Sequence, residues 1–323
     1  MELWSPEIER LRPEARQAVA EGIGGLRALI REPEAPPSDP LERARAARLA
    51  MARAYAPVPE ATERTIAGVA CRVFVPDGAA TAVYLHFHGG GMILGAPEMN
   101  DIGNLQLCRR LGLAVVSADY RKAPEHPYPA GPDDGLAVAA WLLDHAEDEF
   151  GSGRILVGGE SAGGYMAAAV LLRIRDELGA ASRVDGANLT FGVYDWGRSP
   201  SQRGIRPVDG PDILDPEGIR FFSDCYLPGR TDDERRDPAV SPAFADLRGL
   251  PPAFMSVGTA DHLLDDTLML AGRWAAAGGG VDLFVAPDLP HGFMAFPCGI
   301  TTRWAERMSG WFKAVLAAPP RAG

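Results

Sequence analysis

The sequence predicts an α/β protein with one mostly parallel sheet and helices on both of its faces. From about residue 65, apolar runs of strand length recur as "IAGVACRVFVP", "AVYLHFH", "AVVSADY", "ILVGGES", "LTFGVYD", "AFMSVG" and "VDLFVAP". Helical windows separate the later runs, as in "GPDDGLAVAAWLLDHAEDEF", "GGYMAAAVLLRIRDEL" and "DDTLMLAGRWAAAG". Near-continuous apolar strands that alternate with helices are typical of a parallel sheet buried on both faces. In such sheets the functional site forms at the carboxyl ends of the strands.

Two helices are expected before the first strand. Ser5 followed by Pro6 has the residue types of a helix start, and apolar residues follow at positions 8, 11, 15 and 19. The segment "REPEAPPSDP" interrupts this pattern, and Asp39 with Pro40 can begin a second helix through "LERARAARLAMARAY". We therefore expect residues 1–64 to be helical and residues 65–323 to hold the sheet.

Composition and charge exclude several classes of function. The chain has 323 residues, 46% of them hydrophobic, which is enough for a large core. Its formal net charge of -11 argues against a nucleic-acid partner, because such partners require a basic surface. No apolar run approaches the roughly 20 residues of a membrane span, and the charged N-terminus does not resemble a signal peptide.

Cysteine usage fits a protein of the reducing cytoplasm. The four cysteines, at positions 71, 108, 225 and 298, are scattered without C-x-x-C spacing. This pattern indicates neither a zinc site nor a disulfide framework. We expect a cytoplasmic protein without a metal site.

A serine stands where a nucleophile is expected. The run "RILVG" leads into "GESAGG", in which Gly159, Ser161 and Gly163 satisfy G-x-S-x-G between a predicted strand and a predicted helix. In this context small residues allow a strained turn that raises the serine hydroxyl above the sheet. Ser161 is therefore the predicted nucleophile; the alternative is a glycine-rich helix start with an idle serine.

Three consecutive glycines follow an earlier strand in "YLHFHGGGM", residues 84–92. Attack of serine on a carbonyl creates an oxyanion, and each backbone N–H aimed at it is worth about 3 kcal/mol. Glycines let the backbone approach closely, and "HGGG" is typical of an oxyanion loop. The predicted donors are Gly90, Gly91 and Ala162, with His88 bracing the loop; the alternative is a merely flexible turn.

A serine nucleophile requires a base, and six histidines compete for that role. His291 in "LPHGF" follows the last predicted strand and is the predicted base. His262 is the alternative, although it directly follows the best candidate for the orienting acid. The histidines at positions 86, 126 and 145 are interpreted as structural.

The orienting acid is expected after its own strand and between the serine and the histidine in chain order. Asp261 in "GTADHLLDD" meets this condition after "PAFMSVG", and Asp195 meets it after "LTFGVY". We prefer Asp261 and keep Asp195 as the alternative. Asp265 and Asp266 are interpreted as first-turn charges on the dipole of the next helix.

Taken together, these motifs resemble those of the hormone-sensitive lipase family of α/β-hydrolases, in its bacterial esterase branch. The matching segments are "HGGGM", "DYRKAPEHPYPA", "GESAGG", "GTADHLLDD" and "PHGF", and the resemblance covers roughly residues 65–315 in the family's order. By this resemblance Ser161, Asp261 and His291 take the triad positions. The resemblance also assigns residues 1–64 and an insertion at about 196–236 to a helical cap over the site.

The resemblance implies a serine carboxylesterase that acts on short- to medium-chain esters through an acyl-enzyme, without metal or organic cofactor. Met92 replaces a frequent aromatic residue and Tyr165 a frequent asparagine, which leaves substrate preference open. Met92, Tyr165, Trp196 and Phe222 are the predicted substrate-binding residues. An amidase or acyltransferase with the same triad remains an alternative, and a non-catalytic binding protein is disfavoured because His291 is present. Many members of the family form homodimers, but no surface is assigned here.

Overall fold

The computed structural model describes residues 3–30, 37–52, 55–208, 210 and 213–321. Its centre is an eight-stranded sheet in the order β1-β2-β4-β3-β5-β6-β7-β8. The strands are Thr62–Ile66 (β1), Val69–Phe74 (β2), Ala82–Phe87 (β3), Leu113–Ala118 (β4), Ile155–Glu160 (β5), Val184–Thr190 (β6), Ala253–Gly258 (β7) and Val281–Ala286 (β8). All neighbouring pairs from β4 to β8 are parallel, whereas β2 is antiparallel to both β1 and β4. The prediction of a mostly parallel sheet is confirmed.

The first expected strand is a hairpin. Ala67 and Gly68, both with positive φ (49° and 84°), turn the chain between β1 and β2. Strand β1 lies at the edge of the sheet and is mostly exposed, so its sequence "TERTI" is charged. It therefore lacks the apolar run by which the other strands were predicted. The strand begins at Thr62, so the sheet starts before the expected boundary between residues 64 and 65.

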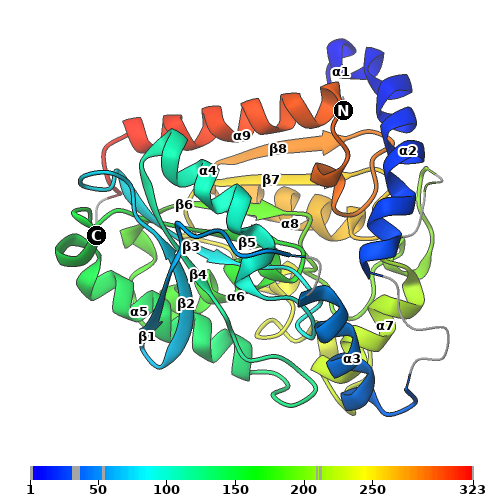
Figure 1. The fold of residues 1–323 in the computed structure, drawn as a ribbon, viewed down its shortest axis with the longest axis horizontal. Helices are drawn as coiled ribbons and strands as arrows, with labels where there is room; N and C mark the ends of the chain where they lie inside the picture. The colour runs from blue at the N-terminus through cyan, green and yellow to red at the C-terminus, as the bar shows by residue number, and fades with distance from the viewer. Residues whose placement is uncertain (1–2, 31–36, 53–54, 209, 211–212, 322–323) are drawn as a thin grey trace.

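Helices cover both faces of the sheet, as expected (Figure 1). Helices α4 (Asp101–Leu111) and α9 (Gly299–Ala317) pack on one face, where Phe312 and Leu111 share a core with Tyr84. Helices α5 (Ala130–Phe150), α6 (Ala162–Asp176) and α8 (Leu264–Ala276) pack on the other. The sequence analysis named no segment for α4 or α9.

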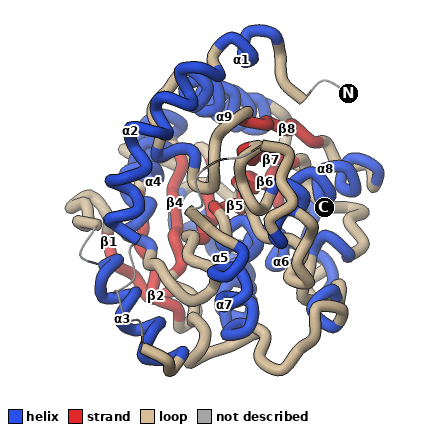
Figure 2. The backbone as a smooth tube through the Cα atoms, turned by 90° about the vertical axis from the view of Figure 1, so that its right-hand side faces the viewer, coloured by secondary structure: helices blue, strands red, loops and turns tan. Residues whose placement is uncertain are grey.

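Three further helices precede the sheet and one lies in the insertion before β7. They are α1 (Pro6–Arg10), α2 (Arg12–Ile30), α3 (Pro40–Ala52) and α7 (Pro216–Tyr226). Ser5 Oγ accepts from Ile8 N (3.3 Å) and Asp39 Oδ2 accepts from Glu42 N (2.9 Å), so both predicted helix starts are confirmed. Helices α2, α3 and α7 stand beyond the carboxyl ends of the strands (Figures 1 and 2).

Two predicted elements differ from the structure. The single helix expected after Ser5 breaks at Leu11 into α1 and α2. The run "LTFGVYD" was expected to be a strand, but β6 ends at Thr190 and the following residues form a loop. The residues "DGAN" after Val184 in β6 are polar or small, so the first half of this strand carries no apolar signal. Short 3-10 turns complete the structure at residues 97–100, 181–183, 201–203, 234–236, 242–244 and 293–295.

None of the helices in the described ranges combines the length and the apolar character that crossing a bilayer requires.

Candidate active site

Ser161 lies on a strained turn between β5 and α6. Its backbone has φ 57° and ψ −120°, a conformation that non-glycine residues rarely adopt. The turn is tight: a Cβ on Gly159 or Gly163 would stand 2.2 or 1.9 Å from the carbonyl oxygen of Phe87. The two glycines of the G-x-S-x-G motif are thus required by the approach of β3, and they let the turn present the serine hydroxyl.

The structure brings the three predicted triad side chains into one hydrogen-bonded row. His291 Nε2 lies 2.9 Å from Ser161 Oγ, and His291 Nδ1 lies 2.9 Å from Asp261 Oδ2. Asp261 is fully buried, and its other oxygen accepts from Leu263 N (2.8 Å). If Nδ1–H donates to the carboxylate, Nε2 is free to accept the proton of the serine hydroxyl.

Two neighbouring loops hold the acid and the base in register. The acid loop (residues 259–263) follows β7 and the histidine loop (residues 287–292) follows β8. Thr259 N donates to Ala286 O (2.9 Å), and Ala260 N donates to Leu289 O (3.1 Å). The Asp288 amide also donates to Thr259 Oγ (2.8 Å). The sequence analysis did not identify Thr259 or Asp288, because this pairing between loops has no motif.

An aromatic ring completes the wall beside the base. Phe191, directly after β6, packs edge-on against His291 with ring centroids 4.8 Å apart. The same ring contacts Phe293 at 5.4 Å. Phe191 is only 3% exposed, so it limits the positions that the imidazole can adopt. Sequence reasoning missed this residue, since it was assigned to the interior of a strand.

The oxyanion loop (residues 88–95) lies against the nucleophile turn. A Cβ on Gly89 would stand 3.4 Å from the Cβ of Ser161, and Gly90 and Gly91 have positive φ (120° and 63°). In the described part of the chain, no carbonyl or side chain accepts a hydrogen bond from the amides of Gly90, Gly91 or Ala162. Unpaired amides beside a nucleophile are available to a developing oxyanion.

His88 braces this loop, in agreement with the sequence prediction. Its Nδ1 lies 2.7 Å from Gly89 O, and its ring stacks on Tyr120 at 4.4 Å. The Tyr120 hydroxyl donates to His88 O (2.8 Å). Burial, with a smaller contribution from Lys122, lowers the pKa of His88 well below its ordinary value. A neutral, buried imidazole suits a structural role.

Within the described residues, Asp195, the alternative acid, forms no hydrogen bond with His291. Its carboxylate forms an ion pair with Arg236 (3.2 Å) and accepts from Gly197 N (2.7 Å). His262, the alternative base, is 3% exposed, and its Nδ1 lies 2.8 Å from Ser201 O. Both residues therefore face the loop that enters the insertion rather than Ser161.

The remaining histidines have structural neighbours. His86 Nε2 lies 2.9 Å from Glu160 Oε2 and its Nδ1 lies 2.8 Å from Ser117 Oγ, all within the sheet. His145 stacks on Trp141 at 4.7 Å. His126 is an exposed residue of the turn that precedes α5.

Three of the four predicted substrate-binding residues are buried in the core. Met92 and Tyr165 have no exposed surface, and Trp196 is 2% exposed. The Tyr165 hydroxyl lies 2.9 Å from that of Tyr226, so this ring belongs to an aromatic cluster. Their burial does not fit direct contact with a substrate and indicates a packing role behind the site.

Phe222 differs from these three, because it is partly exposed and lies over the oxyanion loop. A Cβ on Gly91 would stand 2.6 Å from its ring. The ring comes from α7, so the insertion reaches the glycines directly. Its neighbour Phe221 is covered by the guanidinium of Arg43 from α3, 4.1 Å from the ring centroid.

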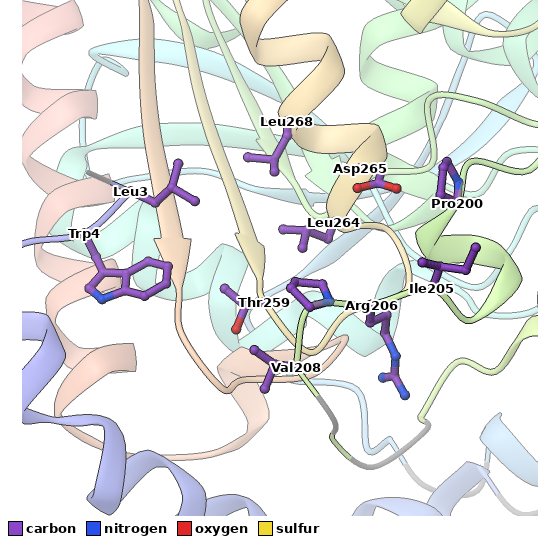
Figure 3. Close-up of a pocket in the computed structure, with 11 residues that line it drawn as sticks. Leu3, Trp4, Pro200, Ile205, Arg206, Val208, Thr259, Leu264, Asp265 and Leu268 are labelled. Atoms are coloured by element: carbon purple, nitrogen blue, oxygen red, sulfur yellow. The ribbon is translucent and has the colours of Figure 1, made fainter. Parts of the chain in front are cut away.

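A cavity of about 560 Å³ lies beside the acid loop (Figure 3). Its wall comes from the N-terminus (Trp4), the loop before α7 (Ile205) and α8 (Leu264 and Leu268). Thr259 belongs to the lining, but none of the three triad residues does. Within the described ranges, no group of three or more His, Cys, Asp or Glu residues is arranged to hold a metal ion, and the four cysteines are buried free thiols.

Comparison with known proteins identifies similar chains. A family profile described as alpha/beta hydrolase fold matches residues 84–295. Carboxylic ester hydrolase LipN from Mycobacterium tuberculosis is 37% identical over 67% of this chain and 58% of its own length. Esterase LipI from the same organism is 37% identical over 68% of each chain. A crystal structure of a hormone-sensitive lipase from a metagenome library is 30% identical, has a TM-score of 0.76, and matches 95% of this chain and 98% of its own.

Proposed function

This chain belongs to the alpha/beta hydrolase fold family, among its hormone-sensitive lipase-like carboxylic ester hydrolases, and we propose that it hydrolyses short- to medium-chain esters with Ser161, His291 and Asp261 as its triad. The observation that carries the proposal is the row Asp261, His291, Ser161 with two contacts of 2.9 Å. Unpaired amides of the oxyanion loop lie beside the same serine. No other described serine combines these features with a strained turn.

In the proposed mechanism His291 Nε2 removes the proton of Ser161 as Oγ attacks the ester carbonyl. Asp261 orients the imidazole and stabilises its cation. The amides of Gly90, Gly91 and Ala162 donate to the oxyanion of the tetrahedral intermediate. The imidazolium then donates its proton to the leaving alkoxide, which leaves an acyl-serine. In the second half, His291 activates a water molecule that releases the acid and restores the serine.

The polar character of the segments outside the sheet favours a short-chain ester as the substrate. We propose that residues 1–61 and 196–236 form a cap over the site, since β1 begins at Thr62, and that Phe222 of this cap packs against Gly91 of the oxyanion loop. Helix α3 carries three arginines within "ERARAARLAMA", and the segment "GRTDDERRDP" after α7 is almost wholly polar. Such polar segments suit a surface in water rather than at an oil interface. A cytoplasmic location remains a prediction. A homodimer also remains a prediction, and no surface is assigned to it.

A series of p-nitrophenyl esters from acetate to palmitate tests the proposal. Each methylene that enters the pocket is expected to raise kcat/KM until Phe222 and its neighbours stop further entry, since a buried CH₂ contributes about 0.8 kcal/mol. We expect a maximum between roughly two and eight carbons, the limit being set by pockets of about 300 to 1,000 Å³. Ser161→Ala is the matched control. A maximum at palmitate, or activation on emulsified triolein, would make the protein a lipase instead.

A further inference from the structure

The N-terminal helices contact the loops of the active site through arginine side chains. From these contacts we propose that Arg12, Arg16 and Arg48 are positioning residues, the first two for the histidine loop and the third for the oxyanion loop. This inference rests on the proposed function, because it concerns the alignment of the triad and of the oxyanion donors. It gives the N-terminal segment a role in the chemistry in addition to covering the site.

The first contact joins α2 to Asp288 of the histidine loop. Arg12 donates to both carboxylate oxygens of Asp288 (2.8 and 3.0 Å), and Arg16 Nε donates to one of them (2.8 Å). The Asp288 side chain is only 2% exposed. Burial acts in the opposite direction, yet the hydrogen bonds from the two arginines lower the pKa of Asp288 below its ordinary value. A buried carboxylate needs such partners, so the loop depends on α2 for its conformation.

Asp288 is also connected to both functional loops. It precedes His291 by three residues, and its backbone has φ +62°, a strained value for a non-glycine residue. Its amide donates to Thr259 Oγ (2.8 Å), two residues before Asp261. A displacement of Asp288 would therefore move the base relative to the acid that orients it.

The second contact joins α3 to the oxyanion loop. Arg48 Nε donates to Ile93 O (2.6 Å), three residues after Gly90. Its Nη2 donates to Ala123 O (2.6 Å), and Nη1 and Nη2 both reach the carboxylate of Glu125 (2.8 and 2.9 Å). Ile93 N and Leu94 N in turn donate to Gly90 O (3.1 and 2.7 Å), so the turn that Arg48 holds includes an oxyanion glycine.

Two other ion pairs provide matched controls. Arg303 of α9 contacts Glu7 of α1 (2.8 Å), with side chains 49% and 54% exposed. Arg45 of α3 contacts Glu125 at 3.6 Å, and its own side chain is 63% exposed. Both attach the same N-terminal segment, but neither reaches a backbone carbonyl or a buried carboxylate of the active-site loops. Exposed pairs of this kind contribute little.

Steady-state kinetics on p-nitrophenyl butyrate and ethyl butyrate test the first contact. The double variant Arg12→Ala/Arg16→Ala is expected to lower kcat by about 10- to 100-fold with a smaller change in KM, since a misaligned base costs this much. The loss in kcat/KM, which reports acylation, should be larger for ethyl butyrate, because its alkoxide needs a proton from His291, whereas p-nitrophenolate leaves without one. Arg12→Lys/Arg16→Lys should restore part of the rate.

The second contact predicts a different signature. Arg48→Ala should lower kcat by a similar factor on both esters, because the oxyanion forms before either alcohol leaves. Arg303→Ala and Arg45→Ala should stay within about twofold of the wild type on both substrates. Asp288→Asn, which keeps the backbone bond to Thr259, should behave like the double arginine variant. Thermal unfolding above the assay temperature establishes that each variant is folded.

The outcomes separate this inference from the proposed function. A wild-type protein that hydrolyses neither ester would overturn the proposed function itself. A wild type that is active while the arginine variants match the controls would overturn only the positioning role.

Discussion

Asp195 and Asp261 occupy similar places in the fold but contact different partners. Each lies beyond a parallel strand, and their exposed fractions are 3% and 0%. Asp261 contacts the imidazole of His291 (2.9 Å), whereas Asp195 contacts the guanidinium of Arg236 (3.2 Å). A carboxylate beside an imidazole can orient a base, but one beside a permanently charged guanidinium takes no part in proton transfer. The partner, not burial, distinguishes the two acids.

The distance from the strand explains why the partners differ. Asp261 follows the end of β7 at Gly258 by three residues, while Asp195 follows the end of β6 at Thr190 by five. The longer segment carries Asp195 into the base of the insertion. There its amide and that of Tyr194 donate to Asp266 (both 2.8 Å). The position after a strand therefore reduces the candidates for the orienting acid to Asp195 and Asp261. The segment that packs against each carboxylate then determines which of them contacts His291.

The stretch "DHLLDD", residues 261–266, contacts both His291 and the base of the insertion. Asp261 faces His291, whereas Asp266, in the first turn of α8, accepts from Ser199 Oγ (2.7 Å) and Gln202 Nε2 (2.9 Å). His262 also faces this side through Ser201 O. One short segment thus joins the proposed triad to the base of the insertion.

The largest expected effect sharpens the comparison by testing whether the row of Asp261, His291 and Ser161 acts as a unit. Ser161→Ala and His291→Ala should each lower kcat/KM by on the order of 10⁵- to 10⁶-fold, and the double variant should lose little more. Steady-state kinetics on p-nitrophenyl butyrate measure this. Additive losses of transition-state stabilisation in the double variant would show that Ser161 and His291 act independently. They would contradict the assignment of Asp261 to a shared triad.

The next effect compares the two acids directly. Asp261→Asn should lower kcat/KM by about 10⁴-fold, because an amide cannot hold the imidazole in the required tautomer. Asp195→Asn should keep most of the activity and instead lower the free energy of unfolding by about 1–2 kcal/mol, since it weakens a partly buried ion pair. Kinetics and urea unfolding of both variants provide the test. The reverse order of activities would transfer the orienting role to Asp195.

The smallest effect concerns Asp266 and stability. Burial raises the pKa of Asp266 to about 7, against the hydrogen bonds from the Asp195 amide and Ser199. Because the folded value exceeds the unfolded one, this group stabilises the fold below about pH 4, and the contribution is lost as the pH rises through about 7. Between pH 5 and 8 the wild type should lose about 2 kcal/mol more than Asp266→Asn. Equal losses of unfolding free energy in wild type and variant would show that the Asp266 carboxylate is already ionised in the folded protein at pH 5.

Much of the fold could be predicted because its strands are buried on both faces. The apolar runs of β3, β4, β5 and β7 were recognised for that reason, whereas β8 lies at the other edge, is only partly buried and still carries an apolar run. The edge strand β1 is charged, and β6 begins with small and polar residues, so neither carries that signal over its full length. The apolar composition of a strand, rather than its place in the sheet, therefore decides whether the sequence predicts it.

The site divides in a similar way. Ser161 and the glycines were predictable because a strained turn and a close backbone approach restrict the residue type. Asp288 and Arg48 act through contacts with residues far away in the sequence, and no local pattern announces such contacts. Met92 and Tyr165 were selected by resemblance, but their burial depends on packing that only the structure reveals.

The most direct test of the central claim is covalent labelling by a fluorophosphonate, followed by intact-mass measurement and peptide mapping. The probe phosphonylates a serine only when a base activates it and an oxyanion site receives the developing charge. We predict one added probe per chain on Ser161, much slower labelling of His291→Ala and Asp261→Asn, and near wild-type labelling of Asp195→Asn. An unlabelled wild type, or a label that persists in Ser161→Ala, would contradict the account.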